Sequence, residues 1–336
     1  MPTLAGVLAW HEAVNERMQG LISKHPSAEL LWIVRLGIEH EQQYQELLLT
    51  DIKHLFSCSA LYSPYKQSAV QPLDHAYMLP TMAWLKGTSG VQEMGVSAHT
   101  SEFHFDSEAP RHSVYLNPYE IGRRLITNAE WQEFIADGGY DQYQWWLDAG
   151  WSWLKKEGVQ APLYWQTHHD TTQVFTLNGS LEIDLMAPVS HISYFEGDAF
   201  SRWKSATDLT FKGSRLPTEA EWECFVQNEV RTIPAQNNLL ESDLLTPTRT
   251  PIINQPAQFF GDVWEWTMSH YTPYSGYQPW GGLAGEYNGK FMVNQMVLKG
   301  GSCLTPESHL RSTYRNFFPT ASRWQMTGLR LARDEI

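Results

Sequence analysis

Residues 261–266 read Gly-Asp-Val-Trp-Glu-Trp, and stretches of this kind decide how most of the chain folds. Glycine permits a tight turn, and each tryptophan offers a large apolar surface with one N–H donor. Other turns in the chain likewise combine Gly or Pro with Trp and with arginines that we expect to be buried. We interpret them as scaffold: Phe105–His112, Ile126–Trp131, Pro188–Ser193, Ser214–Trp222, Leu298–Ser302 and Gly328–Leu331.

The overall composition fits a globular protein with a sizeable core. The chain has 336 residues, of which 42% are hydrophobic, and this length suits one large domain with an appendage. Its 15 tryptophans favour a fold built from long packed loops. The formal net charge of −13, without any basic run, argues against nucleic acid or anionic lipid as a partner.

Cysteine content and hydropathy indicate the cellular compartment of the protein. The three cysteines, Cys58, Cys224 and Cys303, are odd in number and form no Cys-x-x-Cys pair. We therefore expect neither a disulfide framework nor a thiolate zinc site. No apolar stretch approaches the length of a membrane span and no signal-peptide pattern begins the chain, so a cytoplasmic location is expected.

The residue pattern predicts three segments. Residues 1–57 are expected to form two helices, the second capped by Ser27, and residues 58–79 are expected to be a linker. Residues 80–336 are expected to form one α+β domain with much irregular structure. Within it we predict strands at 113–116, 119–121 and 296–298, and helices at 128–135, at 194–203 and after Thr218, where Glu221 completes a capping box.

The most distinctive pattern lies in the second predicted helix. His40 and Tyr44 are four residues apart and share one helical face, with Gln43 beside them. Two histidines at this spacing chelate one metal ion, but here the second position is tyrosine. The polar run 39–46 interrupts an apolar helix, which suggests a polar cavity; the alternative is a solvated face with an incidental histidine.

Other candidate sites have simpler explanations. Two further groups of histidines are candidate metal sites: His104 with His112, and the run His168-His-Asp170. The alternative is that they are incidental surface histidines. Ser302 has no evident His and Asp partners, which disfavours a serine hydrolase. The Tyr-rich run 271–287 is expected to line the cleft between the domains, where one tyrosine would serve as a proton donor.

Taken in order, the scaffold stretches resemble the formylglycine-generating-enzyme-like domain, a variant of the C-type lectin fold, over about residues 80–334. Formylglycine-generating enzymes place two copper-binding cysteines shortly after their Gly-Gly-Ser motif. Here residues 304–310 contain no cysteine, and Cys303 has no partner nearby. The resemblance therefore indicates this fold with a different chemistry.

A second resemblance covers the whole chain. It rests on the helix from His40-Glu-Gln-Gln to His54, on Gly285-Glu-Tyr-Asn-Gly-Lys-Phe-Met292 and on Tyr314-Arg-Asn-Phe-Phe-Pro319. Together these resemble the iron-dependent sulfoxide synthases of ergothioneine biosynthesis. In that family a DinB-like four-helix bundle supplies three histidines to a nonheme Fe(II), which uses O2 to join cysteine or γ-glutamylcysteine to hercynine.

The resemblance assigns roles to matching residues. His40 would be an iron ligand, Gln43 would contact the hercynine imidazole, and Asn316 would hold the trimethylammonium end. Many members continue with Trp-Asp, whereas Phe317 and Phe318 follow here, so Phe317 would offer a cation–π contact. Without the acidic group, free cysteine is favoured over γ-glutamylcysteine as the thiol.

The chain departs from the family pattern at the metal. Tyr44 stands where the family has its second histidine, and the remaining ligand belongs to an earlier helix, so the chain resembles an N-terminally shortened member. A separate chain or a second copy would then complete the partial bundle. The alternatives are altered ligation as an Fe(III)-tyrosinate, or a non-catalytic relative that binds a betaine or amino acid. A structural calcium in the large domain is a further candidate cofactor.

Overall fold

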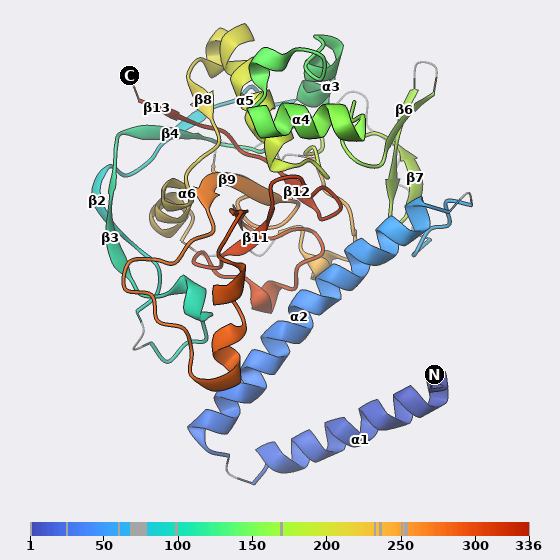
Figure 1. The fold of residues 1–336 in the computed structure, drawn as a ribbon, viewed down its shortest axis with the longest axis vertical. Helices are drawn as coiled ribbons and strands as arrows, with labels where there is room; N and C mark the ends of the chain where they lie inside the picture. The colour runs from blue at the N-terminus through green and yellow to red at the C-terminus, as the bar shows by residue number, and fades with distance from the viewer. Residues whose placement is uncertain are drawn as a thin grey trace. The chain divides into compact units, whose positions relative to one another are not determined.

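The computed structural model divides into two compact units, Met1–Tyr44 and Gln45–Ile336, and the division falls inside one long helix. We describe the units separately; Figure 1 shows their elements. The structure describes residues 2–24, 26–59, 61–67, 79–97, 100–168, 171–231, 233–234, 237–249, 251 and 255–335.

The small unit contains helix α1 (Leu4–Ile22) and the first part of α2 (Ala28–Ser57). These confirm the two helices predicted from the sequence. Ser27 caps α2 as expected, since its Oγ accepts a hydrogen bond from the Leu30 N–H at 3.2 Å. No residue of α1 is buried, and Trp10 is 68% exposed, so two helices bury little of their apolar surface. A complete four-helix bundle is not part of the described chain.

The large unit is built from small sheets joined by long loops, as the aromatic composition predicted. Within its described residues, strands pair antiparallel except for β12 with β9. Two sheets have four strands each, in the spatial orders β1 (Trp84–Lys86), β4 (Tyr119–Gly122), β13 (Ala332–Asp334), β8 (Ser214–Arg215) and β11 (Asn316–Pro319), β10 (Gln295–Lys299), β9 (Trp264–His270), β12 (Thr327–Gly328). Strands β2 (Gly90–Met94) and β3 (His112–Leu116) form a third sheet. Strands β5 (Trp165–His168), β6 (Thr171–Thr176) and β7 (Gly179–Glu182) form a fourth.

Four α-helices accompany these sheets in the described residues: α3 (Asn128–Ala136), α4 (Asp148–Glu157), α5 (Tyr194–Thr207) and α6 (Glu219–Phe225). Those predicted are present, and the expected capping box of Thr218 and Glu221 forms. Helix α4 and the β5–β7 meander were not predicted. Leu147 at the start of α4 provides no side-chain cap, so the usual start signal is missing.

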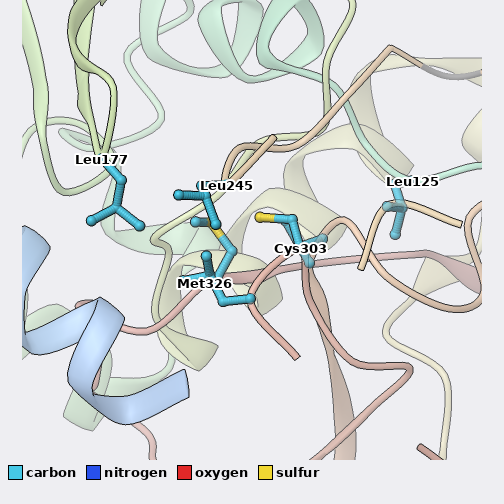
Figure 2. Close-up of a cluster of buried hydrophobic side chains, with 7 residues drawn as sticks. Leu125, Leu177, Leu245, Cys303 and Met326 are labelled. Atoms are coloured by element: carbon cyan, nitrogen blue, oxygen red, sulfur yellow. The ribbon is translucent and has the colours of Figure 1, made fainter. Parts of the chain in front are cut away.

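A cluster of buried apolar side chains forms part of the core of the large unit. Cys303 lies beside Leu245 and Met326 in this cluster (Figure 2). Leu49 and Ile52 of α2 pack against it, so the C-terminal part of that helix belongs to the large unit. The whole cluster comprises Leu125, Leu177, Leu245, Val263, Cys303, Leu304 and Met326.

A buried ion pair joins three of the sequence stretches singled out above. Arg330 donates from Nε to Oε2 of Glu265 at 2.9 Å and from Nη2 to Oε1 at 3.0 Å, and both side chains are fully buried. Trp222 donates its indole N–H to the same carboxylate at 3.0 Å. Burial raises the pKa of Glu265 even though Arg330 opposes the shift. The scaffold role expected for these stretches is confirmed.

Replacing Arg330 by Met should lower the free energy of unfolding by about 3–5 kcal/mol, because it leaves the Glu265 carboxylate buried without its cation. Urea unfolding followed by tryptophan fluorescence measures this. The matched control is Arg202→Met, which removes a half-exposed helical pair with Asp198 and should cost about 0.5 kcal/mol or less. Equal losses in the two variants would contradict the structural role of Arg330.

Candidate functional site

The residues predicted to bind substrate in the large unit lie on β11, at the edge of its sheet. Phe317 stacks on the ring of Tyr271, with centroids 4.1 Å apart and planes 15° apart. The ring of Phe291 lies 5.6 Å from Phe317 on a tilted plane and is 40% exposed. Phe317 therefore contacts one fully buried ring and one ring that reaches solvent.

Arg315 fixes the start of this strand. Its Nε donates to Oε1 of Glu219 at 2.7 Å, and its guanidinium lies 4.0 Å from the centroid of Tyr274. Burial alone would raise the pKa of Glu219, but the charges of Arg315 and Lys299 hold it below its ordinary value. The carboxylate is thus ionised, and Arg315 serves the scaffold while the next residues are free to face a ligand.

Asn316 and Phe317 present complementary groups. The Asn316 Oδ1 accepts a hydrogen bond from the Phe317 N–H at 2.8 Å. Within the described part of the chain its Nδ2 makes no hydrogen bond, so this donor is available beside the aromatic rings. Aromatic faces attract quaternary ammonium groups through their quadrupole. The arrangement can therefore hold an organic cation that also carries a hydrogen-bond acceptor.

His40, Gln43 and Tyr44 belong to the small unit, on α2. The rings of His40 and Tyr44 lie 4.5 Å apart at 39°, which confirms that they share one helical face. Across the described residues, no group of three or more His, Cys, Asp or Glu side chains is arranged to hold a metal ion. His40 and Tyr44 alone do not form a complete iron site.

Glu46 is a functional candidate that the sequence did not single out. Its Oε1 accepts hydrogen bonds from Trp264 Nε1 at 2.8 Å and Ser302 Oγ at 2.6 Å, and its Oε2 accepts one from Thr305 Oγ1 at 2.7 Å. Both carboxylate oxygens are thereby occupied, which fixes the rotation of this part of α2. The sequence feature that points to this role is a carboxylate within an otherwise apolar helix.

The Gly-Gly-Ser stretch forms the turn that carries Ser302. Gly300 and Gly301 both have positive φ, and a Cβ on Gly300 would lie 2.7 Å from the carbonyl oxygen of Phe259. The turn presents Ser302 to Glu46 as a hydrogen-bond donor. Ser302 therefore has a structural role, in agreement with the expectation that it is not a hydrolase nucleophile.

Lys53, also not singled out from the sequence, is buried against His191. Its Nζ lies 2.6 Å from His191 Nε2 and 4.8 Å from the ring centroid of Tyr164. Burial lowers the pKa of Lys53 to about 7, and the neighbouring Cys303 opposes this only partly. Burial and then the charge of Lys53 lower the pKa of His191, so a neutral imidazole accepts the bond from Lys53.

Of the remaining histidine candidates, some contact the backbone of their own segment and others lie outside the side chains that the structure describes. The Nδ1 of His112 lies 2.9 Å from the Pro110 carbonyl, and that of His104 lies 3.2 Å from the Glu102 carbonyl. The run His168-His-Asp170 falls outside the side chains that the structure describes.

Two tyrosines of the run 271–287 form hydrogen bonds within the large unit. The hydroxyl of Tyr274 donates to Glu219 at 2.9 Å, and that of Tyr277 donates to Asp106 at 2.9 Å. These hydrogen bonds give the two hydroxyl groups partners within the scaffold. The expectation that the run lines a cleft between the domains stays a prediction.

Comparison with known proteins gives a family model within the large unit and relatives that cover most of the chain. Residues 67–229 and 256–335 match the model for the sulfatase-modifying factor enzyme 1-like domain. The chain is 33% identical over 328 residues to a hercynine oxygenase of Mycolicibacterium smegmatis, covering 89% of this chain and 71% of the relative. A hercynine oxygenase of Mycobacterium tuberculosis is 34% identical over 261 residues, covering 72% of this chain and 58% of the relative.

Among solved structures, PvdO from Pseudomonas aeruginosa shares the fold, with a TM-score of 0.50 and 19% identity over 77% of this chain and all of that one. No helix among the described residues combines the length and apolar character needed to cross a membrane.

The burial of Lys53 predicts a pH dependence of stability. Between the folded pKa of about 7 and the unfolded value of 10.5, the unfolded chain binds a proton that the folded chain does not. Stability should therefore rise with pH across this window, by up to about 1.4 kcal/mol per pH unit from this residue. Lys53→Met should remove that component, and urea unfolding at several pH values from 7 to 10 measures it.

The control for this experiment is Lys212→Met, because Lys212 is exposed. Its stability should follow the wild-type curve in parallel. If the Lys53→Met and wild-type curves were parallel as well, the amine would be charged in the folded protein.

Proposed function

Because the chain belongs to the sulfatase-modifying factor enzyme 1-like family, we propose that it acts on hercynine in C–S bond formation of the ergothioneine-biosynthesis sulfoxide-synthase type. The similarity to hercynine oxygenases over most of the chain supports the substrate. The single observation that carries the proposal is the stack of Phe317 on the buried Tyr271, with the partly exposed Phe291 and the Asn316 amide beside it.

The proposed substrate fits the chemistry of these groups. Hercynine carries a trimethylammonium group next to a carboxylate. We propose that the cation rests on the face of Phe317 and that Asn316 Nδ2 donates to an oxygen acceptor of the same end. Gln43 is proposed to contact the imidazole. Phe318 offers no charge to a γ-glutamyl group, which supports free cysteine as the thiol.

The overall reaction balances with dioxygen as the oxidant. The C2–H bond of the imidazole and the S–H bond of the thiol are replaced by a C2–S bond, and the sulfur gains one oxygen atom. The second oxygen atom leaves as water with the two hydrogens. Activating O2 is the chemistry that a bound nonheme Fe(II) would supply.

The described residues do not fit a complete Fe(II) site. His40 offers one imidazole, and Tyr44 offers a phenolate that favours Fe(III). We therefore propose that a separate chain or a second copy supplies further ligands to His40. The second candidate function, a non-catalytic protein that binds a betaine or amino acid, is favoured by the same donor set. A structural calcium stays a proposal without a cluster of described ligands.

Aerobic incubation of the Fe(II)-treated protein with hercynine and cysteine tests the catalytic proposal. We expect formation of the sulfoxide, seen by mass spectrometry, with matching oxygen uptake. His40→Ala should abolish both and should lower the iron retained after gel filtration. Binding of hercynine without product, and with iron content unchanged in His40→Ala, would establish the non-catalytic alternative.

Hercynine binding should depend on one of two neighbouring phenylalanines. Phe317→Leu should weaken binding about tenfold, that is by about 1.4 kcal/mol, because leucine fills the space without an aromatic face. Phe318→Leu is the matched control, since Phe318 packs edge-on against Trp324 at 5.5 Å. Isothermal titration calorimetry with hercynine measures both. Equal affinities in these two variants would place the trimethylammonium group elsewhere.

A further inference from the structure

The C-terminal end of α2 carries an exposed thiol beside an imidazole. Cys58 follows the last residue of the helix and is exposed to solvent. Its Sγ lies 3.9 Å from Nε2 of His54, which is four residues earlier on the same helical face. The thiol and the ring nitrogen are thus within the range of a sulfur hydrogen bond, at a surface that a small molecule can reach.

The other nitrogen of this imidazole contacts a fixed side chain from a distant part of the chain. His54 Nδ1 lies 3.1 Å from the hydroxyl oxygen of Tyr164. The Tyr164 ring meets His191 edge-on at 4.7 Å, and Lys53 Nζ lies over its face. Tyr164 is only 8% exposed. Its position is therefore fixed by the domain, and it sets the orientation of the His54 ring.

Nucleophilic side chains are activated by a base within reach and by a third group that orients the base. We propose that Cys58 is a site of thiol–disulfide exchange with low-molecular-weight disulfides, with His54 accepting the thiol proton and Tyr164 holding the imidazole. This proposal is independent of the hercynine chemistry proposed above.

The step balances without a further reagent. The sulfur of Cys58 attacks one sulfur of the disulfide RS–SR, forming a protein mixed disulfide as the original S–S bond breaks. The leaving thiolate takes up the proton that His54 accepted and departs as RSH. Cys58 is oxidised, and the released half of the disulfide is reduced.

The other two cysteines provide internal comparisons. Cys224 and Cys303 are buried. Burial raises the pKa of Cys224 to about 12, and burial likewise raises that of Cys303 well above its ordinary value. Both thiols stay protonated and covered at neutral pH, so neither should react in the folded protein. Exchange should therefore map to a single cysteine.

The test uses the reduced full chain with glutathione disulfide or cystine as the probe, followed by intact mass and peptide mapping. We expect one adduct, at Cys58, and none in Cys58→Ser. His54→Gln keeps a polar side chain without a base and should slow the exchange by about tenfold, below the usual range for general bases because the site is open to water. Tyr164→Phe should give a smaller decrease.

A matched exposed thiol separates activation from simple exposure. Ser152→Cys in the Cys58→Ser background places a thiol on the surface of α4, where the residue four positions earlier is Asp148. Cys58 of the wild type should react about tenfold faster than this thiol. Circular dichroism confirms that each variant is folded. Equal rates for Cys58 and the thiol at 152, or an adduct on Cys224 or Cys303, would overturn the proposal.

Discussion

The large unit depends on the buried pair of Arg330 and Glu265. Small sheets and long loops leave many backbone carbonyls without a partner in regular structure, and each must find a donor when it is buried. Arg330 satisfies several at once, since it also donates to the carbonyls of Gly122, Ala257 and Gln258. Its guanidinium packs on Phe259 at 3.7 Å. One side chain thus connects its own segment with residue 122, residues 257–259 and residue 265.

This pair also determines what the neighbouring residues can do. Glu265 points inward on β9, and Trp264 beside it points to the opposite side and donates to Glu46. Strand β10 pairs with β9 on one edge and with β11 on the other, so the register of β11 follows from the position of β9. The aromatic site at Phe317 is therefore built on the same sheet that holds the C-terminal part of α2.

Two kinds of contact hold that part of α2. The carboxylate of Glu46 accepts hydrogen bonds from three donors, and these bonds replace the water that it loses on burial. Lys53, by contrast, has its pKa lowered to about 7 by burial, and its close partner is the neutral imidazole of His191. The first contact specifies the rotation of the helix at little cost, whereas the second reduces stability at neutral pH. A costly contact of this kind suggests a role in positioning rather than in stability.

The sequence by itself predicted the local features of this protein. Capping residues predict the starts of helices such as α2 and α6, because a cap acts within one helical turn. The spacing of His40 and Tyr44 likewise places both rings on one helical face, because residues four apart lie one turn from each other. It also indicated that the Trp- and Gly-rich stretches form a scaffold. The tertiary structure alone decided which distant residues meet.

His191 meets Lys53 across 138 residues, Ser302 meets Glu46 across 256, and Phe317 lies on Tyr271 because of the strand register. Such contacts arise from burial and long-range pairing. No local pattern encodes either of them.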